Sequence, residues 1–189
     1  MAPLAAGVTG LVLAAGAGVR AGGPKALRHG ADGTPWLATV VGALRAGGCA
    51  QVVVALGAES ERARPLVPGP ARVVEVPDAA TGLSASLRAG LAAVDAGTIA
   101  VLVALVDEPG LPAAAVRRIA ASAAPDALVR AGYTGRPGHP VLLGREHLAA
   151  VAAAAVGDRG AGPYLAAHGA RLVECGDLWD GRDVDGPPG

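Results

Sequence analysis

Short apolar runs alternate with alanine-rich segments of helical length along most of this chain. The apolar runs are rich in valine, leucine and isoleucine, which favour strands. They predict strands at 8–13, 51–55, 72–76, 99–106, 126–131, 139–143 and 171–174. The segments between them predict helices at 35–46, 59–66, 84–96, 112–123, 145–155 and 162–168. This order predicts a Rossmann-like three-layer α/β/α sandwich around a mostly parallel sheet.

Residues at the ends of these segments predict where some elements start and stop. Thr34 followed by Pro35 predicts a helix with Thr34 as its N-cap and proline at its first position. The stretch 81–86 likewise predicts a hydroxyl N-cap ahead of a helix rich in alanine and leucine. The Gly/Pro-rich end, 183–189, predicts a surface tail. Because the 189 residues contain no repeat and no long linker, a single domain is expected over 1–189.

Composition narrows the class of protein. Hydrophobic residues are 52% of the sequence and aromatic residues 2%, so the core must be built from alanine, valine and leucine. A formal net charge of zero argues against a nucleic-acid partner. No apolar run reaches the roughly 18 residues that a membrane span needs, so no membrane partner is expected. Cys49 and Cys175 lack metal-ligand spacing, which favours a cytoplasmic location.

A glycine-rich run after the first apolar stretch is the main candidate for ligand binding. It extends from Leu13 to Lys25, the only lysine in the chain. Its glycines allow sharp turns that bring backbone N–H groups close to a phosphate. A Walker loop would need a hydroxyl residue after the lysine, where Ala26 stands. A dinucleotide fingerprint fits poorly because Pro24 interrupts the start of a helix.

An acidic residue at the end of the predicted strand 99–106 is the second candidate. Packing does not explain Asp107 after a buried strand, and the end of this strand falls on the same sheet edge as the glycine-rich run. Magnesium–nucleotide sites use few protein carboxylates, so one aspartate here is compatible with such a site. A turn or helix-capping carboxylate ahead of Pro109 is the alternative interpretation.

The pattern Leu-Ala-Ala-Gly-x-x-x-Arg-x-Gly-x-Pro-Lys over 13–25 resembles the signature loop of MobA-like nucleotidyltransferases. The resemblance implies that the loop wraps the triphosphate of a nucleotide, and that Arg20, Lys25 and Asp107 form the catalytic group. Asp107 matches the family's magnesium-binding aspartate. The loop residues implied to contact the nucleotide are Leu13, Ala14, Ala15, Gly16, Gly18 and Lys25.

Four further segments carry the same resemblance, and one of them is 157–161. Gly82, Ser84 and Ser86 match a family segment beside the nucleotide base. Gly138, His139 and Pro140 match a turn that enters a strand and borders the acceptor substrate. The end of the chain resembles an Asp-x-Asp-Thr-Pro element, which implies that Asp185 completes the metal site with Asp107. Gly186 replaces the threonine of that element, which weakens the inference of activity.

The resemblance implies transfer of a nucleoside monophosphate from a magnesium-bound triphosphate to a phosphorylated acceptor. CTP as donor and molybdopterin as acceptor are the best expectation, with Mg²⁺ as cofactor. The sequence leaves open whether a molybdoenzyme or a chaperone is a partner. One alternative is an NAD(P)H-dependent enzyme similar to the nicotine blue oxidoreductase group, which shares a Val-Asp-x-Pro-Gly variant with 106–110. Another is a nucleotide-binding relative without catalysis.

Overall fold

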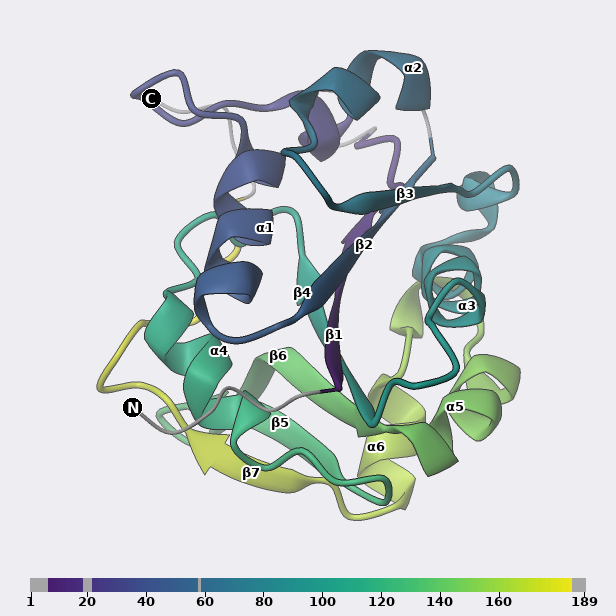
Figure 1. Ribbon diagram of the computed structural model, residues 1–189, viewed down its shortest axis with the longest axis vertical. Coiled ribbons are helices and arrows are strands. Elements are labelled where there is room, and N and C mark those ends of the chain that lie inside the picture. Colours follow the sequence, from purple (N-terminus) through teal and green to yellow (C-terminus); the bar gives the residue numbers. More distant parts are fainter. Residues whose placement is uncertain (1–6, 19–21, 58, 185–189) are drawn as a thin grey trace.

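The computed structural model describes residues 7–18, 22–57 and 59–184, and it builds one seven-stranded sheet from them (Figure 1). The strand order is β3-β2-β1-β4-β6-β5-β7. The strands are β1 (Val8–Ala14), β2 (Gln51–Leu56), β3 (Arg72–Glu75), β4 (Ala100–Leu105), β5 (Leu128–Tyr133), β6 (Arg136–Gly144) and β7 (Arg171–Glu174). All seven predicted strands are therefore present.

The directions of the strands determine which chain segments lie together at the edge of the sheet where β1 and β4 end. β1 lies between β2 and β4 and is parallel to both. β6 is antiparallel to β4 and β5, so the first half of β6 lies beside the carboxyl end of β4. Thr134 and Gly135, with φ of 52° and 78°, join β5 to β6 as a two-residue turn. The mostly parallel sheet is confirmed, and β6 is its antiparallel member.

Helices cover both faces of the sheet (Figure 1). α1 and α4 lie on one face, while α3, α5 and α6 lie on the other. Alternate residues of β1 enter the two layers: Val12 packs with the α1 side, and Leu11 and Leu13 pack with the α3 side. The helices are α1 (Trp36–Ala46), α2 (Ser60–Ala63), α3 (Leu83–Ala92), α4 (Ala113–Ala120), α5 (Leu148–Ala154) and α6 (Gly162–Ala167). The three-layer sandwich is confirmed.

Some helix ends differ from the prediction. The N-cap of α1 is Pro35, and Thr34 does not cap the helix, because the Thr34 hydroxyl and N–H both donate to the Asp32 carboxylate. The predicted helix 59–66 contains only α2 and a 3₁₀ turn, η3 (Arg64–Leu66). Pro65 explains the break, since proline has no N–H to continue the α-helix.

The segment after β7 returns to the end of β4. Trp179 packs edge-to-face on Tyr133, with the ring centroids 5.4 Å apart. The N–H of Val184 then donates to the backbone carbonyl of Asp107 at 2.8 Å. The prediction of a surface tail from 183 is therefore wrong for Val184, which packs against the core. The rest of that tail, 185–189, lies outside the described residues.

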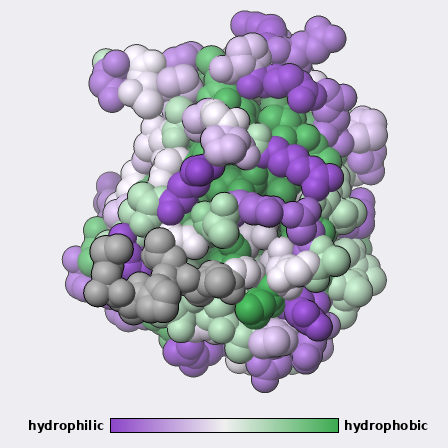
Figure 2. Space-filling model, viewed as in Figure 1, coloured by the Kyte–Doolittle hydropathy of each residue, from purple (hydrophilic) through white to green (hydrophobic). Residues whose placement is uncertain are grey.

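The surface carries few large apolar side chains. Among the described residues, only Val156 and Leu172 are exposed large hydrophobic residues. On the face seen in Figure 2, hydrophobic and polar residues are interspersed. Within the described ranges, none of the helices has the length and apolar character that crossing a bilayer would require.

Candidate functional site

The glycine-rich loop leaves β1 at the carboxyl edge of the sheet. Ala15 is buried, and the chain reaches the surface at Gly16. Gly18 has a φ of 60°, and its carbonyl accepts a hydrogen bond from the N–H of Gly23 at 3.1 Å. A Cβ at Gly18 would lie 1.9 Å from the Gly23 oxygen, so this turn requires glycine. Arg20, which the family resemblance places in the catalytic group, lies outside the described residues.

The loop ends in an ion pair. Lys25 begins a 3₁₀ turn, η2 (Lys25–Leu27). Its Nζ lies 2.7 Å from Oδ2 of Asp107, which follows β4. The two side chains are 19% and 18% exposed, so the pair is mostly shielded from water. The structure thus brings together the lysine and the aspartate that the sequence singled out, at one edge of the sheet.

The metal prediction rests on Asp107 and Asp185. Within the described residues, no group of three or more histidine, cysteine or acidic side chains could hold a metal ion. Asp185 lies outside the described residues, but Val184 before it is hydrogen-bonded to the Asp107 backbone. One carboxylate at this edge fits the usual magnesium–nucleotide site, in which one or two carboxylates and the phosphates supply the ligands.

A second carboxylate beside Asp107 was missed by the sequence prediction. Glu108 is only 5% exposed, and its Oε1 lies 3.4 Å from Nδ1 of His139. Its other oxygen, Oε2, is buried and has no hydrogen-bond partner among the described residues. The carbonyl of His139 accepts a hydrogen bond from the Tyr133 hydroxyl at 2.6 Å. Burial, as the largest cause, raises the pKa of that hydroxyl.

The predicted acceptor segment lies in a strand, as predicted for His139 and Pro140, but the strand begins earlier than expected. Gly138, His139 and Pro140 lie inside β6, since the turn before it is at 134–135. Glycine at 135 adopts the positive φ that such a hairpin turn needs, so the strand can start at Arg136 and not at the predicted 139. His139 consequently sits beside the end of β4, where its contact with Glu108 forms.

The predicted nucleotide segment at the start of α3 is buried at both of its serines. Ser84 and Ser86 are only 2% and 3% exposed. No hydroxyl caps α3: its N-cap is Gly82, with a φ of 109°. The carboxylate of Asp158, from η6 (Gly157–Arg159), accepts the N–H of Leu83 at 3.4 Å instead. Contacts of Gly82, Ser84 and Ser86 with a nucleotide stay predictions.

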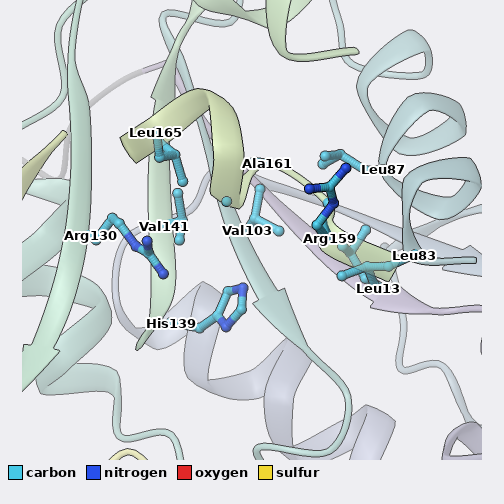
Figure 3. Close-up of a pocket in the computed structure, with 12 residues that line it drawn as sticks. Leu13, Leu83, Leu87, Val103, Arg130, His139, Val141, Arg159, Ala161 and Leu165 are labelled. Atoms are coloured by element: carbon cyan, nitrogen blue, oxygen red, sulfur yellow. The ribbon is translucent and has the colours of Figure 1, made fainter. Parts of the chain in front are cut away.

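A cavity of about 110 Å³ lies next to the edge of the sheet that carries Asp107, on the face that α3 and α6 cover (Figure 3). Leu13 and His139 line it, together with Arg130 and with Arg159 from the matched segment 157–161, neither of which was among the predicted site residues. Arg130 stands inside an apolar strand, and that position was the available signal. Its Nε is buried without a hydrogen-bond partner among the described residues.

Comparison with known sequences identifies a family. Residues 10–172 match the MobA-like NTP transferase domain. The nicotine blue oxidoreductase of Paenarthrobacter nicotinovorans is 37% identical over 190 residues, which cover 94% of this chain and 92% of that protein.

Comparison with solved structures gives the same fold. A homolog of Mycobacterium tuberculosis Rv0371c from Mycobacterium sp. strain JC1 superposes with a TM-score of 0.82 and 31% identity, over 95% of this chain and 90% of that one. Rv0371c itself, in complex with manganese, superposes with a TM-score of 0.70 and 27% identity, over 89% and 88%. The family match covers most of the chain, and the fold agrees with it: this protein belongs to the MobA-like NTP transferase domain family.

Proposed function

We propose that this protein transfers a nucleoside monophosphate from a magnesium-bound nucleoside triphosphate to an acceptor. The ion pair of Lys25 with Asp107 is the observation that carries the proposal. A cation and a carboxylate stand together, partly shielded, at the end of a glycine-rich loop in a family of NTP transferases. This is the pair of charges that a triphosphate and its divalent cation require.

Each residue has a stated task in this proposal. An acceptor oxygen attacks the α-phosphorus, a new P–O bond forms, and the bond to the bridging oxygen of the β-phosphate breaks to release pyrophosphate. Lys25, with Arg20, neutralises charge on the phosphates, while the loop from Ala14 to Gly18 offers backbone N–H groups to them. Asp107 and Lys25 compensate each other before the nucleotide arrives, so neither charge is left unbalanced.

Asp107 would hold the metal ion, with Asp185 as the second proposed ligand. A divalent cation at this place would draw electron density from the phosphate oxygens. The hydrogen bond from Val184 to the Asp107 carbonyl supports Asp185 as the partner, because it fixes the preceding residue beside Asp107. The manganese in the Rv0371c structure supports a divalent cation in a family relative.

CTP is the proposed donor and a phosphorylated acceptor such as molybdopterin the proposed acceptor. The Leu-Ala-Ala-Gly sequence at 13–16 favours the cytidylyl branch of the family. Such an acceptor needs no base to activate it, because a phosphate oxygen is already anionic. The cytoplasmic location expected from the cysteines is part of the same proposal.

A second candidate function rests on the 37% identity with nicotine blue oxidoreductase. In that case the glycine-rich loop would hold the pyrophosphate of NAD(P)H rather than a triphosphate. The observed ion pair favours the transferase, since hydride transfer has no evident need for a carboxylate facing the phosphate-binding lysine.

One experiment separates the two functions. Calorimetry would measure binding of CTP, GTP and ATP with Mg²⁺, and of NADPH, to the full chain. Pyrophosphate release would then be followed with a panel of phosphorylated acceptors, and NADPH oxidation with a quinone. Binding of a triphosphate that requires Mg²⁺, together with pyrophosphate release, supports the transferase. Binding of NADPH alone, with quinone-dependent oxidation, overturns it.

A further inference from the structure

The cavity on the α3 and α6 side of the sheet has a mixed lining. Six apolar side chains form most of its wall: Leu13, Leu83, Leu87, Val103, Val141 and Leu165. Three basic side chains and the segment 160–162 complete it, and Figure 3 shows Arg130 and Arg159 on opposite sides with His139 between them. A small space with apolar walls and converging basic groups suits an organic anion better than a neutral ligand.

Arg130 supplies the strongest indication of a missing ligand. Its Nε is buried and has no hydrogen-bond partner among the described residues. Burial also lowers the pKa of Arg130 below the usual arginine value, although a guanidinium stays protonated. A buried donor without an acceptor is costly, so such groups in native proteins call for an explanation. A bound oxyanion in the cavity would supply the missing acceptor.

The positive charge at the cavity is not compensated by ion pairs. Among the residues that the structure describes, neither Arg130 nor Arg159 pairs with a carboxylate. Asp158, next to Arg159, accepts the N–H of Leu83. That contact holds η6 against the start of α3, so the segment carrying Arg159 is fixed over the cavity. Glu108 lies beside the third basic residue of the lining, His139.

His139 connects the cavity with the proposed reaction centre. It lines the cavity, and its Nδ1 lies 3.4 Å from Glu108, the residue after Asp107. A molecule in the cavity therefore lies close to the end of β4, where the triphosphate is proposed to bind. A pyrimidine base carries no charge, so two guanidinium groups in the lining favour the acceptor over the base as the occupant.

We propose that this cavity is the acceptor subsite, and that the acceptor carries an anionic group, a carboxylate or a phosphate, on a compact apolar body. Arg130 and Arg159 bind the anion and the leucine and valine side chains hold the apolar part. This inference rests on the nucleotidyl transfer proposed above. The volume of about 110 Å³ is well below the roughly 300 Å³ or more of pockets that bury a whole drug-sized ligand, so the cavity takes one end of the acceptor.

The test uses benzoate, benzyl alcohol and inorganic phosphate as probes of the full chain, with affinities measured by NMR titration. Benzoate should bind at least tenfold more tightly than benzyl alcohol and more tightly than phosphate. Arg130→Gln should weaken benzoate at least tenfold, and Arg159→Gln at least threefold. Arg45→Gln, an exposed arginine on α1 at the opposite face, is the matched control and should change nothing. Because Arg159 is exposed, its variant should fold even if Arg130→Gln does not.

Four outcomes decide the proposal. Equal binding of benzoate to wild type and both arginine variants overturns it. Tighter binding of phosphate than of benzoate overturns the inference that the acceptor has an apolar body. Loss of benzoate binding when Mg·CTP saturates the protein means that the nucleotide base occupies the cavity, which also overturns it. Arginine-dependent benzoate binding without any triphosphate binding supports an organic-anion site but rejects nucleotidyl transfer, so the two failures are distinct.

Discussion

The ammonium of Lys25 lies 2.7 Å from a carboxylate oxygen of Asp107, although the two residues follow different strands and are far apart in sequence. The contact ties the end of the glycine-rich loop to the end of β4. Both side chains are about four-fifths shielded from water, which strengthens the interaction relative to a surface pair. In the proposed reaction Lys25 leaves Asp107 and binds a phosphate of the nucleotide. Asp107 then binds the metal ion.

Replacing Lys25 by arginine tests whether the loop needs a compact ammonium. A guanidinium is a planar fork that cannot occupy the same narrow space beside Asp107 and a phosphate. We expect Lys25→Arg to lower the rate of pyrophosphate release at least tenfold, whereas Arg45→Gln, an exposed control, leaves it unchanged. Normal turnover of Lys25→Arg would show that only the charge matters.

Replacing Asp107 by asparagine separates metal binding from phosphate binding. With Mg²⁺ present, calorimetry should show CTP affinity at least tenfold below that of wild type, because a carboxylate ligand is lost. Without Mg²⁺, the variant should bind CTP at least as tightly as wild type, since Lys25 no longer faces the Asp107 carboxylate. Unchanged affinity in Mg²⁺ would remove Asp107 from the metal site.

The strands and the sheet edge could be predicted from the sequence because central parallel strands must be apolar on both faces. β4 has that character, and chemistry placed just after such strands meets at one edge. Lys25 and Asp107 were found in this way. Arg130 could have been noticed as a charge inside an apolar strand, but the absence of a partner for its Nε depends on packing.

Helix caps and contacts between irregular segments were not predictable. Thr34 satisfies the local rule for an N-cap, yet Asp32 binds both its hydroxyl and its N–H. The start of α3 is capped by Asp158 from a distant turn. The hydrogen bond from Val184 to Asp107 joins two segments without periodicity. In each case a neighbour in space outweighs the local preference.

Glu108 is expected to lower the stability of the fold, because it is buried beside His139. A carboxylate that is 5% exposed, with one oxygen unpaired, carries an uncompensated desolvation cost. Glu108→Met should therefore raise the free energy of unfolding by about 1 kcal/mol, as measured by urea denaturation. His139 is 25% exposed, so water can replace the lost partner.

An exposed glutamate provides the control for this stability change. Glu146→Met should change the free energy of unfolding by less than about 0.5 kcal/mol, because Glu146 is at the surface. If Glu108→Met destabilises the protein, Glu108 has a structural role and its burial no longer indicates function.

Two glycine-to-alanine changes distinguish the loop from a helix. Gly18 has a φ of 60° and no room for a Cβ, so Gly18→Ala should distort the loop and reduce Mg·CTP affinity about tenfold. Gly42 lies within α1, with nothing within 4 Å of an added Cβ. Gly42→Ala should keep the affinity and raise stability by about 0.5–1 kcal/mol. Equal affinity in both variants would contradict a nucleotide-binding role for the Gly18 turn.

The buried thiol of Cys49 makes stability depend on pH at alkaline values. Burial raises the pKa of Cys49 from 9.0 to about 12. Between these values the unfolded chain loses the thiol proton while the folded protein keeps it, so the folded state binds more protons and stability falls as pH rises. The slope is about 1.4 kcal/mol per pH unit.

Cys49→Ala removes this contribution, and alkaline titration of other groups, such as Tyr133, affects both proteins equally. The difference in unfolding free energy between wild type and variant, measured by urea denaturation from pH 8 to 11, should therefore move steadily in favour of the variant above pH 9. A constant difference would mean that water reaches the thiol.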